Sequence, residues 1–289
     1  MSDGSERVAA AYLEACHAEL AVVKPGNVHR YAGGHGMSVA DFVHSADASA
    51  AAIAARGARV GVRVRRAVEA TLAAVGQNTN LGIILLCAPL AAASEWEGGL
   101  RRALARVLAS LDASDAADVF VAIALANPGG LGRAARHDVH EPARVTLREA
   151  MEEAADRDRV ARQYVTDYRD IFDAGLPALA AARSANGSPG AATLAVYLAF
   201  LAAFPDSHLA RKFGAATAES VRREAAPWRD ACARAANLGE LTERLLAWDA
   251  SLKSRGLNPG TSADLTVATL FAASLASARG ERLALPPQR

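Results

Sequence analysis

The run LGIILLCAPLAAA, from Leu81 to Ala93, limits the folds open to this chain more than any other stretch. It carries no charge and is apolar around the whole circumference of a helix. Such a helix is stable only where other elements surround it. A membrane span needs about 20 consecutive apolar residues, and this run is shorter and contains Pro89. We therefore expect a central helix buried inside a bundle of other helices.

Helical periodicity continues through most of the chain. Alanine is abundant and aromatic residues make up 5% of the 289, which favours closely packed helices over stacked sheets. Strand alternation, repeats and linkers are not evident, so we predict one all-α domain over residues 1–289, with a frayed tail at 279–289 and a polar cleft lined by inter-helix loops. The predicted helices run from about Ser5 to Val22, Val39 to Arg56, Arg59 to Ala74, Leu81 to Ala93, Leu100 to Leu111, Ala116 to Ala126, Arg144 to Asp173 and Pro189 to Phe204, with two more up to Arg255 and a last one ending near Ala278.

Charge and cysteine content argue against several classes of protein. The formal net charge is +1, with acids and bases mixed, whereas nucleic-acid binders carry a basic patch or stripe. The three isolated cysteines indicate reduced thiols rather than disulfides or a zinc cluster. The start MSDGSER lacks the order of a secretory signal. We expect a cytoplasmic protein without nucleic-acid or membrane partners, in which alanine-rich helices could form a homodimer face.

The most polar junction is VVKPGNVHRYAGGHGM, from Val22 to Met37. Its proline–glycine pair is a turn signal, and chain reversal alone would explain that pair. Chain reversal does not explain why Lys24, His29 and His35 occur together. Lys24 is one of three lysines against 29 arginines, so its compact ammonium is a candidate to meet a ligand; a lysine solvated at a helix end is the alternative.

Two other junctions place polar residues directly before apolar helices, in GQNTNLG and NPGTSAD. Simple capping would explain them, with Thr79 or Asn80 capping the first helix and Thr261 forming a capping box with Asp264 in the second. The same helix starts also offer free N–H groups and the positive end of the helix dipole to a phosphate or carboxylate. Together with the basic pair in DSHLARKFG, they predict a polyphosphate site built from helix ends.

Acidic residues supply candidates for metal binding and for acid–base chemistry. In NPGGLGRAARHDVHEP, residues 127–142, two histidines lack both HExxH spacing and a third zinc ligand nearby. Asp138 and Glu141 fit better as oxygen ligands of Mg²⁺, or as groups that orient a histidine. Asp158 and Arg162 are four residues apart in a helical stretch. They form either an i,i+4 ion pair or part of a polar stripe facing a central cleft.

Four of these motifs together resemble a known family. KPGNVHRYAGGHGMSVADFVHSA, NTNLG before an apolar helix, DSHLARKFG and NPGTSADL are similar, in this order, to motifs of the triphosphoribosyl-dephospho-CoA synthases. The resemblance runs from about Glu19 to Phe271. It implies an all-helical enzyme in which ATP donates a ribosyl group, a ribose hydroxyl of dephospho-CoA attacks the anomeric carbon, and adenine leaves.

The resemblance also implies roles for the polar residues. Mg²⁺, Lys24 and the helix starts would hold the triphosphate, while Asp264 or Asp158 would activate the attacking hydroxyl. Asn27 and His29 would hold sugar or base, and His35 would lie nearer the acceptor. The predicted catalytic residues are thus Asp264, Asp158 and His35, the predicted metal ligands are Asp138 and Glu141, and the predicted binding residues are Lys24, Asn27, His29, Ser45, Asn78, Thr79, Asn80, Arg162, His208, Arg211, Lys212, Asn258, Gly260, Thr261 and Ser262.

The chain departs from the family pattern at two positions beside the apolar helix. Asn80 and Leu81 stand where the family typically has histidine and lysine, so a charge-assisted phosphate contact is lost. This pattern is similar to homologues associated with methanopterin-type cofactor synthesis. The first hypothesis is the family transfer from ATP. The alternatives are a different transfer step on a phosphorylated intermediate of tetrahydromethanopterin-type cofactor synthesis, and a non-catalytic small-molecule binding protein on the same scaffold.

Overall fold

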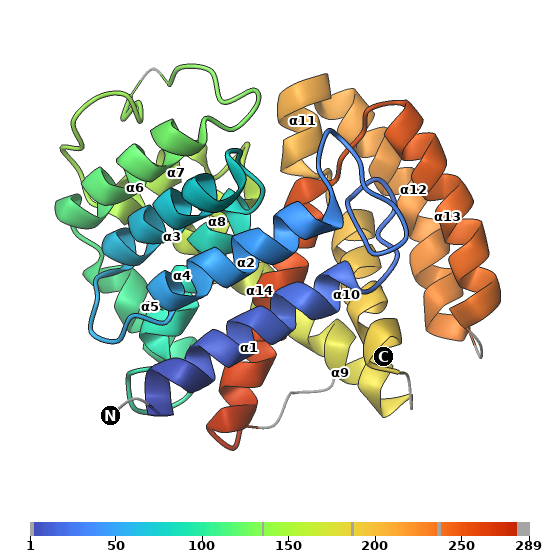
Figure 1. Cartoon of the computed structure of the whole chain (residues 1–289), viewed down its shortest axis with the longest axis horizontal. Helices are drawn as coiled ribbons and strands as arrows, with labels where there is room; N and C mark the ends of the chain where they lie inside the picture. Colours follow the sequence, from blue (N-terminus) through green and yellow to red (C-terminus); the bar gives the residue numbers. More distant parts are fainter. Residues whose placement is uncertain (1–2, 135, 186–187, 236–237, 282–289) are drawn as a thin grey trace.

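The computed structural model describes residues 3–134, 136–185, 188–235 and 238–281. Over these ranges the regular structure is helical, apart from two isolated β-bridges in the 22–37 loop, which confirms the predicted all-α class (Figure 1). The helices are α1 (Asp3–Leu20), α2 (Val39–Ile53), α3 (Val60–Val75), α4 (Leu81–Ala93), α5 (Leu100–Ser110), α6 (Ala113–Ala126), α7 (Leu147–Ala154), α8 (Arg159–Val165), α9 (Leu176–Ser184), α10 (Pro189–Ala203), α11 (Ser207–Phe213), α12 (Ala215–Arg234), α13 (Leu238–Ser254) and α14 (Gly260–Ala278), with a π-helical turn, η1 (Ile171–Gly175), before α9.

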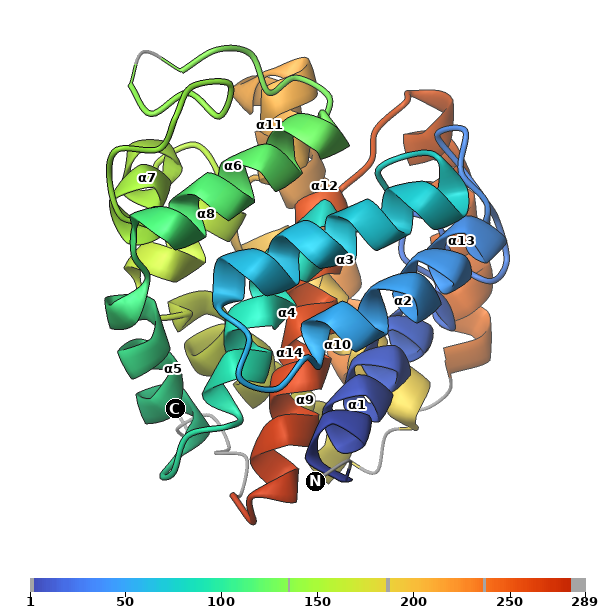
Figure 2. The ribbon, with the colours of Figure 1, turned by 60° about the vertical axis from the view of Figure 1, so that its left-hand side comes forward.

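Helix α4 is enclosed by its neighbours. Every residue in it except Gly82 is buried, and α2, α3, α5, α8 and α14 pack against it (Figures 1 and 2). Pro89 lacks an N–H, so the carbonyl of Leu85 loses its helical donor. The hydroxyl of Tyr164 donates to that carbonyl at 2.7 Å and repairs the loss. The apolar circumference of α4 is thus matched by packing on its sides and by a side-chain hydrogen bond at its proline.

Helix α14 is the long partner of α4. It contacts α1, α4, α10 and α11 and is buried along most of its length. In both ribbon views it runs through the middle of the molecule, from the loops above to the free ends below (Figures 1 and 2). The first turn of α14 therefore lies among the polar loops, and its last turns belong to the apolar core.

The stretch from residue 144 to 173, predicted as one long helical segment, is divided into α7, α8 and η1. Asp158 has an extended backbone, and its carboxylate accepts two N–H groups from the first turn of α8, which makes it the N-cap. Asp167 and Tyr168 then adopt left-handed φ values of 51° and 57° and end α8. Local side-chain capping and left-handed residues outcompete helix continuation here.

Two expectations concern the ends and the surface of the chain. The tail expected at 279–289 is described only to residue 281; residues 282–289 lie outside the described part.

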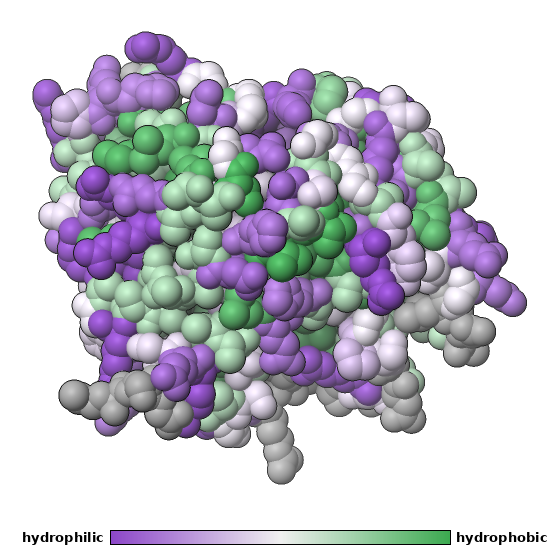
Figure 3. Space-filling model, viewed as in Figure 1, coloured by the Kyte–Doolittle hydropathy of each residue, from purple (hydrophilic) through white to green (hydrophobic). Residues whose placement is uncertain are grey.

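In the described ranges no single helix is long and apolar enough to cross a membrane, although α10 and α11, a pair bent by 48°, pass that test by length and composition. Figure 3 shows hydrophilic side chains spread over one face, with apolar residues between them.

Candidate active site

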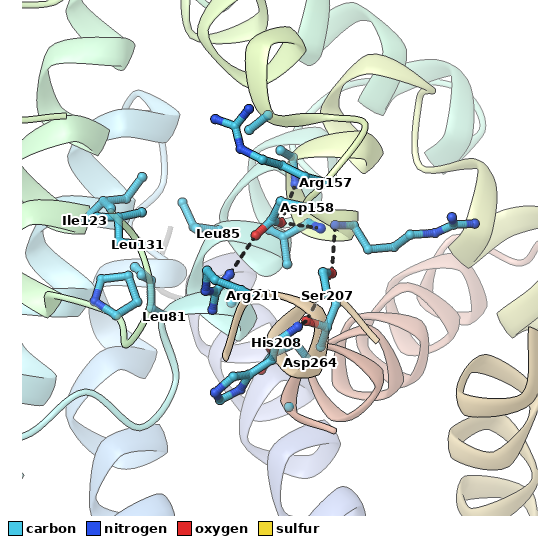
Figure 4. A pocket seen from close by; sticks show the side chains of 18 of the residues that line it. Leu81, Leu85, Ile123, Leu131, Arg157, Asp158, Ser207, His208, Arg211 and Asp264 are labelled. Atoms are coloured by element: carbon cyan, nitrogen blue, oxygen red, sulfur yellow. Dashed lines mark hydrogen bonds and ion pairs between the residues drawn. The ribbon is translucent and has the colours of Figure 1, made fainter. Parts of the chain in front are cut away.

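A cavity of about 810 Å³ lies where the first turns of four helices meet. The starts of α4, α8, α11 and α14 line it, together with the 127–142 loop and Asn27 of the 22–37 loop. Figure 4 shows residues of these segments facing one another across the space. Helix starts leave backbone N–H groups without helical partners and carry partial positive charge, so this arrangement favours an anionic ligand.

Asp206 fixes the starts of α11 and α14 relative to each other. Its carboxylate accepts the N–H of His208 at 2.9 Å from α11, and the N–H and hydroxyl of Ser262, both at 2.8 Å, from α14. The side chain is fully buried. Burial raises the pKa of its carboxyl, while the hydrogen bonds from Ser262 act in the opposite direction. One carboxylate therefore caps two helices.

The capping box expected between Thr261 and Asp264 does not form. Helix α14 begins at Gly260 after Pro259, and no side chain within it caps its first turn. Asp206 takes that role from another helix. The hydroxyl of Thr261 lies 3.2 Å from the N–H of His208 and accepts from it. Asp264 is consequently left free to turn toward the cavity.

Asp264 lies in the cavity wall beside the first turn of α4. Burial raises the pKa of its carboxyl well above the usual range, because the charged form loses hydration. The negative charges of Asp206, Glu19 and Asp158 act in the same direction, and only Lys24 opposes them. A carboxyl group with a raised pKa in a cavity wall is a candidate for proton exchange with a ligand.

Lys24 lies behind the wall of the cavity. It is fully buried, and its ammonium forms an ion pair with Glu19 and donates to Asn27 Oδ1 at 3.1 Å. Asn27 in turn donates through Nδ2 to Asn258 Oδ1 at 2.8 Å. This chain of contacts joins the end of α1 to the loop before α14. Asn27, Asn258 and Glu19 line the cavity, whereas Lys24 supports them from behind.

The 22–37 loop is fastened to α13 by a second buried cluster. Asp249 accepts the N–H of Gly26 at 2.8 Å and forms ion pairs with His29 at 3.2 Å and with Lys253 at 2.9 Å. His29 is fully buried, and burial lowers its pKa. His35 has a left-handed backbone, and its Nε2 lies 2.8 Å from the carbonyl oxygen of Gly26. These histidines hold the loop in shape rather than line the cavity.

The polar wall contains Arg211 and His208 on α11. Arg211 pairs with Asp158 at 3.0 Å and also donates to the carbonyl of Gly129 at 3.1 Å. Burial and the charges of Arg211 and Lys212 lower the pKa of His208 to about 4, so its imidazole is neutral at pH 7. The other guanidinium groups of the wall include two with acidic partners, namely Arg136 with Glu153 and Arg159 with Asp170.

The opposite wall is apolar. In Figure 4, Leu81 and Leu85 of α4, Ile123 of α6 and Leu131 of the 127–142 loop lie across the space from Asp158, Arg211 and Asp264. Phe120 of α6 also lines the cavity. The polar wall of the cavity thus suits a charged group of a ligand, and the opposite wall suits an apolar or aromatic group.

The two acidic residues predicted to bind a metal ion, Asp138 and Glu141, have different surroundings in the structure. Asp138 accepts the N–H of Ala134 at 2.8 Å and the N–H of His140 at 2.9 Å, and these bonds lower the pKa of its carboxyl. Glu141 is exposed and lies outside the cavity lining. Among the described residues no group of three histidine, cysteine or acidic side chains could hold a metal ion. Asp138 therefore shapes its own loop, and Mg²⁺ binding by Asp138 and Glu141 stays a prediction.

Comparison with known proteins decides the family. A family model described as ATP:dephospho-CoA triphosphoribosyl transferase (CitG) matches residues 5–283. The chain belongs to this family. It is therefore a transferase, and the family's substrate is ATP. The resemblance seen in the sequence motifs is confirmed.

A solved structure supports the same assignment. A crystal structure from Archaeoglobus fulgidus, provisionally described as a triphosphoribosyl-dephospho-CoA synthase, is similar with a TM-score of 0.62 and 28% identity. The match covers 82% of this chain and 99% of that one. Among curated proteins there is no significant match.

The sequence-predicted residues of this CitG-family chain divide into two groups. The cavity lining includes Asn27, Asn78, Thr79, Asp138, Asp158, His208, Arg211, Asn258, Gly260, Thr261 and Asp264. The following lie outside it: Lys24, His29, His35, Ser45, Asn80, Glu141, Arg162, Lys212 and Ser262. Some of the second group support the first; Ser45, for example, shares a hydrogen bond of 2.6 Å with Thr79. Asp158 precedes α8 as its cap and pairs with Arg211, so it does not form the ion pair considered with Arg162.

Asn80 and Leu81, the two residues at the start of α4 that were expected to differ from the family pattern, face different ways. Asn80 is buried and points toward α2, with its Nδ2 3.4 Å from both the carbonyl of Ser45 and the hydroxyl of Ser49. Leu81 lines the cavity. Of the two departures, therefore, only the one at Leu81 changes the chemistry of the cavity wall directly.

Sequence reasoning missed three carboxylates: Glu19, Asp206 and Asp249. Each is buried; Asp206 and Asp249 hold together segments distant in sequence, whereas Glu19 pairs with Lys24, five residues further along the chain. A weak signal exists for Glu19, because it lies on the same apolar helix face as Tyr12, Ala15 and Cys16. An acid on a buried face is expensive unless it is paired, so its presence there indicates a partner.

Proposed function

We propose that this chain transfers the triphosphoribosyl group of ATP to a hydroxyl of an acceptor and releases adenine. In this reaction the bond from ribose C1′ to adenine N9 breaks and a bond from C1′ to the acceptor oxygen forms. The hydroxyl proton leaves, and adenine gains a proton. The observation that carries the proposal is one cavity in which Asp264 and Arg211 face apolar side chains across the space.

The polar wall would hold the triphosphate. Arg211 supplies a guanidinium group, and the first turn of α14, at Gly260 and Thr261, supplies helix-start charge. His208 is neutral at pH 7 and so can donate or accept a hydrogen bond without competing with Arg211 for the anion. Asp158 holds Arg211 in place from α8 and would act as its positioning residue.

The remaining lining suits the nucleoside. Leu81, Leu85 and Phe120 provide an apolar surface on which the adenine ring can lie. Asn27 and Asn258 are linked to each other by a hydrogen bond and line the cavity, so their amides are placed to bind ribose hydroxyls. This division would orient ATP with C1′ near the centre of the cavity.

Asp264 would accept the proton of the acceptor hydroxyl. The transition state has oxocarbenium character, and carboxylates at the site stabilise its positive charge. Glu19, also in the lining, would add to that stabilisation. Mg²⁺ belongs to this proposal as part of the Mg–ATP substrate, since Mg²⁺ keeps several waters and is commonly bound through phosphate oxygens and one or two carboxylates.

The acceptor hydroxyl belongs to dephospho-CoA in the first form of the proposal, following the family description. One observation favours a second form, in which the acceptor is a phosphorylated intermediate of a methanopterin-type cofactor. Leu81 faces the cavity among Leu85, Ile123 and Leu131, so this wall offers an apolar surface where a lysine would offer charge. A heteroaromatic acceptor with fewer phosphates suits such a wall better than a second polyphosphate.

Purified protein with Mg–ATP and dephospho-CoA is expected to release adenine and to form a CoA product heavier by the transferred group, both seen by mass spectrometry. Asp264→Asn should lower kcat by about 10²–10⁴-fold, because it removes the proton acceptor without changing size. Asp47→Asn, on the exposed side of α2, is the matched control and should keep wild-type kcat. Equal kcat in wild type and Asp264→Asn would refute the role of Asp264.

The pH dependence follows from the same side chain. Because the pKa of Asp264 is raised, its base form is reached only above the ordinary carboxyl range, so kcat/KM should fall on the acid side at a higher pH than an exposed aspartate would give. If adenine forms with another acceptor and not with dephospho-CoA, the second form of the proposal is the correct one. Absence of adenine with either acceptor would contradict both forms.

A further inference from the structure

Gly82, the second residue of α4, lies directly against the carboxyl group of Asp264. A Cβ atom placed on Gly82 would lie 2.6 Å from Asp264 Cγ and nearer still to Asp264 Oδ2. The optimal separation of two non-bonded carbon atoms is about 3.5 Å or more. A methyl group on residue 82 and the Asp264 carboxyl group in its present position therefore exclude each other. The carboxyl group occupies the space that any other residue at position 82 would need.

Backbone conformation does not explain this glycine. Gly82 is not among the described residues with positive φ, and it lies inside a regular helix. Glycine within a helix costs about 1 kcal/mol relative to alanine in the interior. The adjacent residues Leu81 and Ile83 are both buried and apolar. The chain therefore keeps glycine, a residue of low helix propensity, at position 82, within a regular helix. The adjacent carboxyl group of Asp264 explains why.

The contact also determines where the carboxyl group lies. It rests over the first turn of α4, whose partial positive charge favours an acidic group. Leu81, next to Gly82, lines the cavity, as does Gly82 itself. Asp264 comes from α14, so the contact joins the starts of the two central helices at the cavity wall.

We infer that Gly82 is a positioning residue, whose lack of a side chain forms the seat for the Asp264 carboxyl group. A larger residue would push the carboxyl group away from the point where ribose C1′ and the acceptor meet. The inferred effect on turnover rests on the proposed use of Asp264, whereas the seat itself rests on the contact alone. The two are separable by experiment.

Gly190 provides a matched control. It is the second residue of α10, as Gly82 is of α4, and it is likewise partly buried. A Cβ there would meet Val22 Cγ1 at 3.4 Å, an ordinary contact. The change to alanine therefore has the same effect on helix propensity at both positions, and only at Gly82 does it meet the carboxyl group.

The first experiment compares adenine release by Gly82→Ala and Gly190→Ala in Mg–ATP with the acceptor that supports turnover. Gly82→Ala should lower kcat at least about tenfold with KM for ATP changed less than about threefold, because Arg211 and the apolar side chains proposed to hold ATP are unchanged. Gly190→Ala should keep wild-type kcat. Wild-type kcat in Gly82→Ala would overturn the inference.

The second experiment measures the seat without activity. Thermal unfolding is compared for Gly82→Ala in the Asp264 chain and in Asp264→Ala, which lacks Cγ and Oδ2 and keeps only Cβ, 3.2 Å from the added atom. Gly82→Ala should lower Tm in the first background and leave it unchanged or raise it in the second. Equal shifts in both backgrounds would overturn the seat. If Gly82→Ala fails to fold while the double variant folds, the seat is supported.

The pair of experiments separates this inference from the proposed reaction. Coupling between positions 82 and 264 together with wild-type turnover of Asp264→Asn would refute the chemistry assigned to Asp264, and with it the positioning role of Gly82. Coupling together with low kcat in both Asp264→Asn and Gly82→Ala supports both.

Discussion

Lys24 shows how burial decides what a charged side chain can do. The sequence places it in the most polar loop, and a role against phosphate is the natural expectation. In the folded chain its ammonium has no exposed surface and is bound by Glu19 and Asn27. Burial lowers the pKa of Lys24 and raises that of Glu19, and the attraction between them opposes both shifts. The pair therefore stabilises the wall of the cavity from behind.

A buried pair of this kind predicts a specific pattern of stability. Lys24→Met leaves Glu19 without a counter-charge and should lower the free energy of unfolding by about 3–5 kcal/mol. Lys24→Met combined with Glu19→Gln should cost much less than Lys24→Met alone, because no charge is then stranded. Urea unfolding of the wild type, Lys24→Met, Glu19→Gln and the double variant measures this. Additive losses in the double variant would show that the two charges do not depend on each other.

At the residue scale, the sequence identifies polar side chains that stand at junctions. Asn78, Asn258 and Asp264 were predicted in this way and line the cavity. The sequence could not distinguish a residue that lines the cavity from one that supports the cavity wall, such as Lys24, because both kinds are polar residues in loops. Glu19 and Asp249 escape notice because they lie within helices; the partner of Glu19 is in the loop that follows its helix, and only tertiary packing brings His29 to Asp249.

At the scale of the helix, local caps are predictable and long-range caps are not. The capping box of Ser38 with Asp41 and the cap of Ser188 each join residues within three positions of one another, so the sequence alone indicates them. The start of α14 offers the same kind of pattern, yet Asp206 caps it from a segment 56 residues away. Proximity along the chain thus identifies the correct capping residues of α2 and α10 but the wrong capping residue of α14.

The two kinds of cap should differ in their effect when removed. Asp206→Ala leaves buried N–H groups of α11 and α14 and the hydroxyl of Ser262 without their acceptor, so we expect a loss of about 2 kcal/mol or more in the free energy of unfolding, and a lower kcat. Asp112→Ala removes an exposed cap of α6 and should cost much less, with kcat unchanged. Denaturant unfolding and adenine release test both. Equal losses would mean that Asp206 caps α11 alone.

At the scale of the whole molecule, the cavity should couple nucleotide binding to stability. Mg–ATP at about 100 times its Kd adds about 2.7 kcal/mol to the stability of the folded state. For a chain of 289 residues, whose unfolding entropy is about 0.6 kcal/mol/K, we expect Tm to rise by about 4–5 °C. The rise should be smaller in EDTA, because the triphosphate then lacks its cation, and smaller in Arg211→Ala, which lacks the wall's guanidinium group. An equal rise under all three conditions would place ATP outside this cavity.

The all-α class was predictable because the charge-free run of α4 must be covered on all sides, and most of the rest of the chain has helical periodicity. The meeting of four helix starts was not predictable, because it depends on how α14 packs between the other helices. That packing has a consequence for synthesis. The ribosome releases α4, α8 and α11 before it releases α14, so their ends wait for a helix that arrives last and fills the centre. Contacts of such high sequence separation form late and slowly. The nascent chain should thus stay susceptible to proteases and chaperones until α14 emerges, and then acquire its cavity in a single cooperative step.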